Sequence, residues 1–357
     1  MTGFILMSCK ESAPMPKVSI IILNWNGLND TIECLDSVYR LEYPNFEVVV
    51  VDNCSTDGSV GNISREFPQA FLIENSKNLG FTGGNNVGMK YAMRVGADYV
   101  WLLNNDTVVE PHTLAKLVEE AEQSPQTGLV SPVIYCYDCH EKVQFMGAYV
   151  DFTNFNVTKV KDSKELEIQL IQRNLILWGT ALLIKRKVIE TVGYLSEKYF
   201  AYVEDCDYSF RAMKANYRAS VRLDAHIFHK GSQSTGRHSP IQVFLGTRNL
   251  YFLWSDNTQG FRRILLPGYY IGMVINYVNC LSDEGNEEGC EACLNGFWAA
   301  FRGKGGGYDP TIVIPVWLKI TFCFFVSWYP HFWVRLLRFD VIGIVRAALA
   351  KAQIKFQ

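Results

Sequence analysis

Short apolar runs alternate with stretches of helical periodicity over roughly the first third of the chain. Residues 18–23 and 46–51 are almost entirely apolar, as expected of strands that are buried on both faces of a sheet. Further strands are predicted at 70–74 and 99–104, and helices at 59–67 and 85–95. Strands that alternate with helices indicate an α/β fold with a doubly wound, mostly parallel sheet flanked by helices. Ligands of such sheets bind at the carboxyl ends of the strands.

The alternation of strands and helices changes in the second half of the predicted α/β domain. Residues 143–160 predict a hairpin, 175–184 form an apolar stretch, and 203–216 predict a helix. We expect these elements to extend the same sheet and not to form a separate domain. The expected organisation is an N-terminal extension at 1–16, an α/β domain at 17–235 and a helical, amphipathic region at 236–357.

The C-terminal region carries long apolar and aromatic stretches. Residues 264–281 are apolar, and 311–334 are rich in Trp, Phe and Tyr, with cations inside and just beyond the stretch. Aromatic residues flanked by cations are typical of segments in the headgroup layer of a bilayer. A spanning helix is a second interpretation, although Lys319 and two prolines argue against it. A buried helical subdomain is the third. The sequence therefore predicts a membrane-associating tail and a cytoplasmic chain that is peripheral on the inner face of the membrane.

Composition narrows the class of protein. The 357 residues are 48% hydrophobic and 20% charged, which indicates a globular chain. A formal net charge of -2 argues against a nucleic-acid-binding protein. The N-terminus lacks the pattern of a secretory signal, so the ten cysteines are expected to be reduced. Two Cys-x-x-Cys pairs, Cys136 with Cys139 and Cys290 with Cys293, leave zinc binding open beside free thiols.

Polar loops follow the predicted strands. Asn24 and Asn26 end the first strand and Asp52 ends the second, where a carboxylate and amides can contact a nucleotide base and ribose. A glycine-rich segment at 78–86 precedes a helix, and its backbone N–H groups can face a diphosphate. It matches neither the P-loop nor the dinucleotide-binding pattern. Taken singly, the two strand-end loops favour an ordinary turn, and the glycine-rich segment is equally compatible with a flexible loop that caps a helix.

Carboxylates and a histidine complete the candidate chemistry. Asn104, Asn105 and Asp106 end the fourth strand, and oxygen ligands there suit Mg²⁺ or Mn²⁺. Glu204 and Asp205 open a predicted helix and are candidates for a carboxylate base, although acids at a helix start also stabilise the helix dipole. His229 is a candidate second metal ligand. His226, three residues earlier, is expected to point to the other face of its strand.

Taken together and in order, these stretches resemble the family 2 glycosyltransferases of the GT-A fold, and in particular their rhamnosyltransferase-like branch. The resemblance covers about residues 17–235 and is carried by seven segments: VSIIILNWNG, VVVVDNCSTDGS, NLGFTGGNNVG, WLLNNDT, WGTALLIKR, FAYVEDCDYSFR and HKGS. It implies an inverting, single-displacement transfer of a sugar from a nucleoside-diphosphate donor. Rhamnose is one sugar that the resemblance suggests. The implied acceptor is a saccharide or lipid-linked hydroxyl in the synthesis of a cell-surface polysaccharide.

The resemblance also implies roles for individual residues. Asp205 is the base and Glu204 orients the acceptor, while Asp106 and His229 hold the divalent metal. The implied nucleotide-sugar ligands are Asn24, Asn26, Asp52, Asn78, Gly80, Gly83, Asn86, Asn104 and Asn105. The implied acceptor-facing residues are Trp178, Gly179 and Thr180. Many relatives carry Asp-x-Asp at the metal site, and this chain departs from them with Asn104 at the first position.

Two other functions are compatible with an α/β fold of this kind. A sugar-nucleotide-forming nucleotidyltransferase would carry a cationic, glycine-rich loop after the first strand, whereas residues 24–27 contain no cation. A non-catalytic carbohydrate-binding relative would not need both Asp106 and Asp205. The sequence leaves the oligomeric state open.

Overall fold

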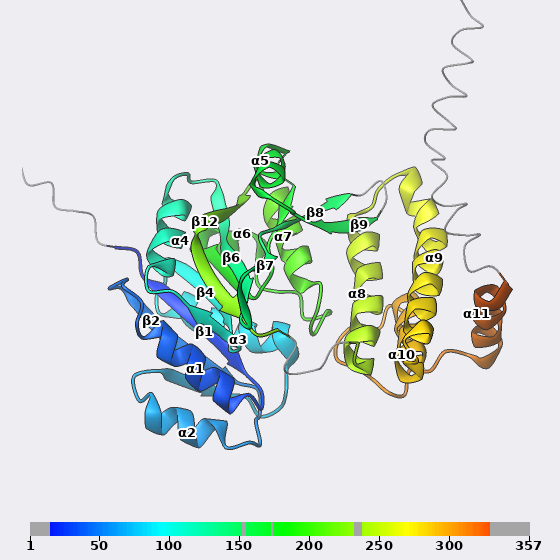
Figure 1. Cartoon of the computed structure of the whole chain (residues 1–357), viewed down its shortest axis with the longest axis horizontal. Helices are drawn as coiled ribbons and strands as arrows, with labels where there is room; N and C mark the ends of the chain where they lie inside the picture. Colours follow the sequence, from blue (N-terminus) through cyan, green and yellow to red (C-terminus); the bar gives the residue numbers. More distant parts are fainter. Residues whose placement is uncertain (1–14, 152–154, 173, 232–237, 329–357) are drawn as a thin grey trace, which may run out of the picture.

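A computed structural model describes residues 15–151, 155–172, 174–231 and 238–328, with side chains described as far as 322. Figure 1 shows an α/β domain, which contains the first seven helices, beside a group of four helices, α8 to α11. Residues 1–14 of the predicted N-terminal extension and residues 329–334 of the aromatic stretch lie outside the described residues.

The central sheet contains nine strands among the described residues. Its strands are β1 (Val18–Asn24), β2 (Phe46–Asp52), β3 (Phe71–Glu74), β4 (Tyr99–Asn104), β5 (Thr107–Val109), β6 (Thr127–Cys136), β7 (Cys139–Phe145), β11 (Ala181–Lys185) and β12 (Arg218–His229). Their order is β3-β2-β1-β4-β11-β6-β12-β5, with β7 paired to β6. A small second sheet has the order β10-β8-β9, from β8 (Ala148–Asp151), β9 (Asn156–Lys159) and β10 (Leu175–Ile176).

The helices of the α/β domain are α1 (Leu28–Val38), α2 (Ser59–Glu66), α3 (Gly80–Arg94), α4 (Thr113–Glu122), α5 (Ser163–Gln172), α6 (Arg186–Val192) and α7 (Glu204–Lys214). The C-terminal helices are α8 (Pro240–Asn257), α9 (Phe261–Asp283), α10 (Glu287–Phe301) and α11 (Val316–Trp328).

The predicted parallel sheet is confirmed for its first half and is mixed in the second. Strands β3, β2, β1 and β4 are parallel neighbours, and β12 is parallel to β6. Strand β11 runs antiparallel to both β4 and β6, and it joins the two halves into one sheet. Strands β6, β11 and β12 of the second half therefore extend the same sheet, as the sequence predicted, whereas β8, β9 and β10 form a separate small sheet, against the prediction.

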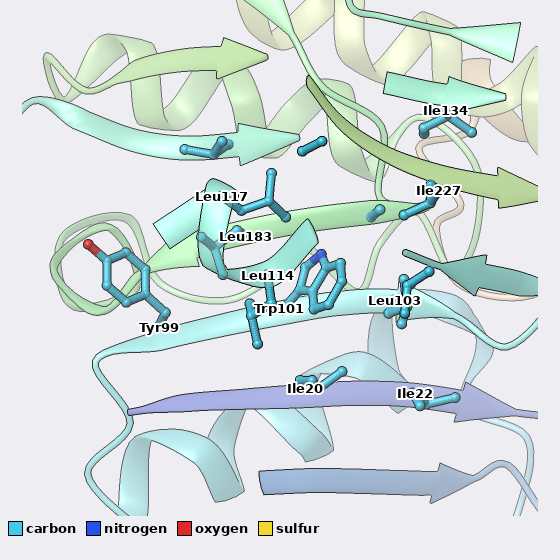
Figure 2. Close-up of a cluster of buried hydrophobic side chains, with 14 of the residues drawn as sticks. Ile20, Ile22, Tyr99, Trp101, Leu103, Leu114, Leu117, Ile134, Leu183 and Ile227 are labelled. Atoms are coloured by element: carbon cyan, nitrogen blue, oxygen red, sulfur yellow. The ribbon is translucent and has the colours of Figure 1, made fainter. Parts of the chain in front are cut away.

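Alternate residues of the central strands enter two different cores, which explains why these strands are apolar throughout. Ile20 and Ile22 of β1 pack in the same core as Leu114 and Leu117 of α4, whereas Ile21 packs with Met89 in the core beneath α3. Figure 2 shows the first core, where Trp101 and Leu103 of β4 lie among side chains from β1, α4, β11 and β12.

Two elements differ from the sequence prediction. The hairpin expected at 143–160 is shorter, because residues up to Phe145 belong to β7 and only β8 and β9 pair with each other. The helix expected at 85–95 already begins at Gly80, so the glycine-rich segment is largely helical and not a loop. A Cβ on Gly84 would lie 2.3 Å from Leu23 Cδ1, and one on Gly88 would lie 2.4 Å from Ile21 Cγ2. Glycine is therefore needed there for close packing of α3 on β1.

The C-terminal helices share a core of their own, with Phe244, Tyr270, Val274 and Phe297 among its buried residues. Helix α9 is long and apolar enough to cross a bilayer by length and composition, and 39% of its most apolar window is buried within the chain. Its outer side is exposed at Phe261 and Ile264. The prediction of a helical C-terminal region is thus confirmed for the described residues.

The zinc hypothesis is not supported by the positions of the cysteines. Cys136 and Cys139 lie at the β6–β7 turn, whereas Cys290 and Cys293 lie on α10 in the helical region. Within the described ranges, no group of three or more His, Cys, Asp or Glu side chains could hold a metal ion. Cys136 and Cys139 are free thiols, and Cys293 is buried beside Thr247.

Candidate functional site

The ends of β1 and β2 meet at one edge of the sheet and hold a network of buried polar side chains. Asn24 and Asp52 are register partners, and both are almost fully buried. The Asn24 amide donates to Asp52 Oδ2 at 2.7 Å, and the backbone N–H of Ser55 donates to Asp52 Oδ1 at 2.8 Å. Burial of a carboxylate is favourable only with such partners. The network fixes Asp52 at the end of β2, beside the loop that the sequence analysis predicted to contact a nucleotide.

Asn26 and Asn105 brace the loop that follows β1. Asn26 adopts a positive φ of 51° and its side-chain oxygen accepts the backbone N–H of Thr56 at 2.7 Å, which ties the two strand-end loops together. The Asn105 amide donates to Thr31 Oγ1 at 2.9 Å. These contacts place both asparagines at the predicted edge, where they shape the loop and where Asn26 is also exposed.

The glycine-rich segment approaches the loop that precedes α7. Asn78 accepts the N–H of Gly80 through its side-chain oxygen at 2.8 Å. Gly80 has a φ of +72°, and a Cβ there would lie 2.5 Å from the carbonyl oxygen of Phe200. Gly83 is similarly constrained, since its Cβ would lie 2.7 Å from Leu79 Cβ. Only glycine fits these positions without displacement of the chain.

Asn86 does not face the site in the way that the sequence suggested. Its amide donates to the carbonyl of Leu195 at 2.9 Å, and its side-chain oxygen accepts the N–H of Leu195 at 2.9 Å. The side chain is buried on α3. Asn86 is therefore a brace for the loop after α6, and we remove it from the residues expected to contact the donor.

Asn53 is a site residue that the sequence analysis missed. It is buried, its amide donates to the carbonyl of Gly80 at 2.9 Å, and its oxygen accepts from the Asn75 amide at 2.9 Å. The residue thereby couples the loop after β2 to the start of α3. Its position directly after Asp52, at the end of a buried strand, was the available signal.

Asp106 and His229 come together although 123 positions separate them in the sequence, which is 229 minus 106. Strand β12 pairs with β5, so His229 lies opposite Thr107, and its Nε2 is 3.2 Å from Asp106 Oδ1. Both side chains are largely buried. His226 instead contacts Glu110, on the other side, as the alternation predicted.

The pair fits a hard divalent cation. Two ligand atoms that are about 2.1 Å from Mg²⁺ in octahedral geometry lie about 3 Å from each other. The Asp106–His229 separation of 3.2 Å is close to that value. Gln144 Oε1 lies 2.6 Å from His229 Nδ1 and can accept an Nδ1–H, and in that tautomer Nε2 would have its lone pair for a metal. Gln144 was missed because no pattern in the sequence connects β7 with His229.

Asn104 lies beside this pair and contributes its backbone to the site. Its N–H donates to the carbonyl of Thr180 at 2.9 Å. Its side chain, which is partly exposed, forms no hydrogen bond with the described residues that would prevent it from facing a ligand. The departure from Asp-x-Asp thus leaves a neutral amide at position 104. Asp106 is the only carboxylate of this three-residue segment.

The acid pair begins α7 next to the same edge. Asp205 Oδ2 accepts the N–H of Gly179 at 3.1 Å, and its Oδ1 accepts the N–H of Cys206 at 2.7 Å. Glu204 is more deeply buried, with 5% of its surface exposed, and its Oε2 has no hydrogen-bond partner among the described residues. The two carboxyl groups therefore have different environments although they are adjacent in the sequence.

These environments shift the two pKa values. Burial raises the pKa of Glu204 well above its usual value, and the charge of Asp205 adds to the effect. Burial also raises the pKa of Asp205, but the N–H groups of Gly179 and Cys206 oppose that rise by stabilising the carboxylate. Backbone N–H donors therefore favour the charged form of Asp205, whereas burial without a partner for Oε2 among the described residues favours the neutral form of Glu204.

The segment 178–180 connects the metal pair with the acid pair. Gly179 donates to Asp205, and Thr180 accepts from Asn104. Trp178 stacks on Phe145 with ring centroids 4.0 Å apart, and the Lys159 ammonium lies 4.5 Å from the centroid of the Trp178 ring. The predicted acceptor residues thus lie between the two groups that the sequence assigned to catalysis.

Comparison with known proteins agrees with this arrangement. A model of the glycosyl transferase family 2 domain matches residues 19–193. A low-salt glycan biosynthesis hexosyltransferase of Haloferax volcanii is 25% identical over 250 residues, which cover 68% of this chain and 78% of the relative. An N-acetylglucosaminyl-diphospho-decaprenol L-rhamnosyltransferase of Mycobacterium tuberculosis is 25% identical over 236 residues, which cover 60% of this chain and 76% of the relative.

A solved structure supports the fold. The mannosyltransferase from Pyrobaculum calidifontis, determined in complex with GDP-Man and Mn²⁺, superimposes with a TM-score of 0.51 at 19% identity. The match covers 93% of this chain and 86% of the mannosyltransferase. The central sheet and its flanking helices therefore have the GT-A architecture that the sequence predicted.

Proposed function

The chain belongs to glycosyltransferase family 2, and we propose that it transfers a sugar from a nucleoside-diphosphate donor to an acceptor hydroxyl with inversion, with Asp205 as the base. The observation that carries the proposal is the meeting of two groups at one edge of the sheet. The Asp106–His229 pair suits a metal, and Asp205 lies next to it through the bridge formed by Gly179 and Thr180.

The donor is expected to lie across the ends of β1, β2 and β4. Asp52, held by Asn24, is the candidate acceptor for an imide N–H of the base, and the exposed Asn26 is the candidate contact for the ribose. The start of α3, with Asn78, Gly80 and Gly83, is the proposed site of the diphosphate and sugar. Helix starts favour anions because their backbone N–H groups lack partners within the helix.

Asp106 and His229 would hold Mg²⁺ or Mn²⁺, and Asn104 and Asn105 lie beside them on the donor side. A divalent ion bound there would neutralise the charge of the departing diphosphate. Two protein ligands leave several positions for water and phosphate oxygens, which is typical of Mg²⁺ sites with diphosphate substrates.

Asp205 is proposed to remove the proton of the acceptor hydroxyl. The acceptor oxygen then forms a bond to the anomeric carbon, the bond between that carbon and the diphosphate oxygen breaks, and the diphosphate leaves with the bonding electrons. One displacement of this kind inverts the anomeric configuration. Glu204, whose neutral form is favoured by burial, can donate a hydrogen bond that orients the acceptor. Trp178, with Gly179 and Thr180, would form the acceptor side.

The proposed acceptor is a saccharide or a lipid-linked saccharide of cell-surface polysaccharide synthesis. Support comes from the mycobacterial relative, whose name specifies a decaprenol-linked N-acetylglucosamine acceptor and an L-rhamnosyl group. Rhamnose is accordingly the first donor sugar to test, and uridine- and guanosine-diphosphate sugars follow it.

A peripheral position on the inner face of the membrane is part of the proposal. Phe261 and Ile264, at the start of α9, are 68% and 73% exposed, and Arg262 and Arg263 lie between them. Exposed apolar residues with adjacent cations suit an anionic bilayer surface. Flotation with vesicles that contain anionic lipid tests this point. Recovery of the protein in the bottom fraction at low salt would argue against membrane binding.

A donor screen tests the function. The purified chain is incubated with Mn²⁺, a decaprenol-diphosphate-linked N-acetylglucosamine acceptor and a panel of sugar nucleotides, and release of nucleoside diphosphate is measured. We expect acceptor-dependent release with at least one donor, and none in the Asp106→Asn variant. If every donor stays intact with the wild-type chain, or if Asp106→Asn releases as much, the proposal is wrong.

A further inference from the structure

The loop that precedes the acid pair, residues 198–203, is held in an unfavourable backbone conformation. Phe200, Tyr202 and Val203 have φ values of 65°, 68° and 74°. Side chains other than glycine rarely adopt positive φ, and Val203 is β-branched, which makes it a strong outlier. Such a conformation persists only where surrounding contacts enforce it. Because Val203 directly precedes Glu204, the conformation of this loop sets the direction from which α7 presents both acids.

One side of the loop is fixed by the start of α3. The N–H of Thr82 donates to the carbonyl of Phe200 at 3.0 Å, and the Thr82 hydroxyl donates to the same oxygen at 3.3 Å. These contacts account for the Phe200 carbonyl. The Tyr199 carbonyl accepts the N–H of Ala201 at 2.8 Å, and the carbonyls of Tyr199, Ala201 and Tyr202 all also face α8.

Two consecutive residues of α8 hold those remaining carbonyls. The Asn249 amide nitrogen lies 2.9 Å from the carbonyl oxygen of Tyr199, 2.8 Å from that of Ala201 and 2.8 Å from that of Tyr202. One side-chain amide therefore contacts three backbone carbonyls of the strained loop. Asn249 is itself completely buried, so these contacts are not exchanged for water.

Arg248 reinforces Asn249 from the same helix. Its Nε donates to Asn249 Oδ1 at 3.0 Å, which orients the amide toward the loop, and its Nη2 donates to the carbonyl of Tyr199 at 3.1 Å. The guanidinium is fully buried and forms no ion pair with any Asp or Glu that the structure describes. Burial lowers the pKa of Arg248 to about 10. A buried charge whose partners are backbone carbonyls is costly, which indicates that those carbonyls need a fixed position.

We propose that Arg248 and Asn249 are positioning residues of the transferase, which hold the 198–203 loop so that Asp205 faces the acceptor. This inference rests on the proposed function of Asp205. It assigns to the C-terminal helical region a role in catalysis that is separate from any contact with a membrane. Neither residue touches the reacting atoms, so both act through the loop.

The test compares Asn249→Ala with a matched control on the neighbouring helix. Asn295 on α10 is also a buried asparagine, but it accepts the N–H of Ile314 within the helical region and does not contact the loop. Both variants remove a buried amide. Only Asn249→Ala is expected to lower kcat, by about 100-fold, because a displacement of about 1 Å at a catalytic group has that effect. The KM for the donor is expected to stay within about threefold of the wild-type value, since the hydrogen bonds of the Asn249 amide join it to none of the residues proposed to bind the donor.

Arg248→Lys provides a second variant that keeps the charge. Lysine lacks the planar fork that reaches both Asn249 and Tyr199, so kcat is expected to fall by about 10-fold or more with the donor KM little changed. All rates are measured well below the melting temperature of each variant, with folding checked by circular dichroism. A kcat of Asn249→Ala within about twofold of that of Asn295→Ala, or a loss that appears only in the donor KM, would overturn the proposal.

A measurement without substrate separates this proposal from the proposed function. The amide N–H groups of Thr82 and Ala201 donate to loop carbonyls, so their hydrogen exchange reports on the loop. We expect faster exchange in Asn249→Ala and wild-type exchange at both amides in Asn295→Ala. Unchanged exchange in Asn249→Ala refutes the positioning role. A wild-type chain that transfers no sugar refutes the proposed function but leaves this measurement valid.

Discussion

The two adjacent acids are predicted to respond in opposite ways to loss of their charge. Glu204 is buried with an unpaired Oε2, and burial raises its pKa well above its usual value, which favours the neutral acid. Asp205 has two backbone N–H partners and carries the charge. Glu204→Gln retains the shape and the hydrogen-bond donor of the neutral acid. Asp205→Asn removes the only group of the pair that can accept a proton.

The expected magnitudes differ by at least tenfold. General base catalysis contributes about 10²–10⁴-fold, so Asp205→Asn should lower kcat by that factor, which corresponds to about 2.7–5.5 kcal/mol of activation free energy. Glu204→Gln should lower kcat by no more than about 10-fold, because the acceptor still meets a neutral donor. Initial rates of nucleoside diphosphate release, measured at saturating donor and acceptor, give both values.

Stability gives an independent reading of the protonation state of Glu204. Because its folded-state pKa lies above the unfolded value of 4.5, its stabilising contribution is complete below pH 4.5 and is lost as the pH rises through the folded pKa. Gln is neutral at every pH and loses nothing. The free energy of unfolding of Glu204→Gln minus that of the wild type should therefore increase above pH 4.5. A Glu204→Gln variant as inactive as Asp205→Asn, with no such increase, would refute the assignment.

Three further predictions concern the metal pair and the packing. Gln144→Leu should weaken Mn²⁺ binding, measured by calorimetry, by about 10–100-fold, because His229 loses the partner that fixes its tautomer, and unchanged affinity would contradict that role. Gly80→Ala should lower the free energy of unfolding in urea by about 1–3 kcal/mol, since its φ is +72° and Phe200 leaves no room for a Cβ, whereas Gly61→Ala on α2, with nothing nearby, should be neutral or stabilising. Leu114→Ala should cost about 2–5 kcal/mol in the same assay, against less than about 0.5 kcal/mol for the exposed Leu223→Ala, and equal effects would contradict the core assignment.

The parallel half of the sheet was predictable because its strands are buried on both faces. Residues 18–23 and 46–51 have no polar face, and helical stretches alternate with them along the chain, as in parallel sheets. The mixed half was harder to predict. Strand β11 is also apolar throughout, but its direction depends on pairing with β4 and β6, and apolar content carries no information about direction.

The site was partly predictable because strand ends converge. Asp106 and His229 were expected to approach each other, and they do so because β5 and β12 pair. Asn86 was misassigned because a motif position does not reveal which backbone groups its amide meets. Gln144 and Arg248 could not be predicted, since their roles arise from contacts between distant segments that no periodicity records. The early start of α3 was missed because close packing against β1 overrides the low helix propensity of glycine.

The central claim is a single displacement in which Asp205 accepts the proton of the acceptor hydroxyl. Proton NMR of the first product, formed from the donor that the screen identifies, reports the anomeric configuration before it can change. A single displacement with Asp205 as the base predicts inversion relative to the donor, and no product from Asp205→Asn over the same time. Retention of configuration, or an inverted product from Asp205→Asn at the wild-type rate, would contradict it.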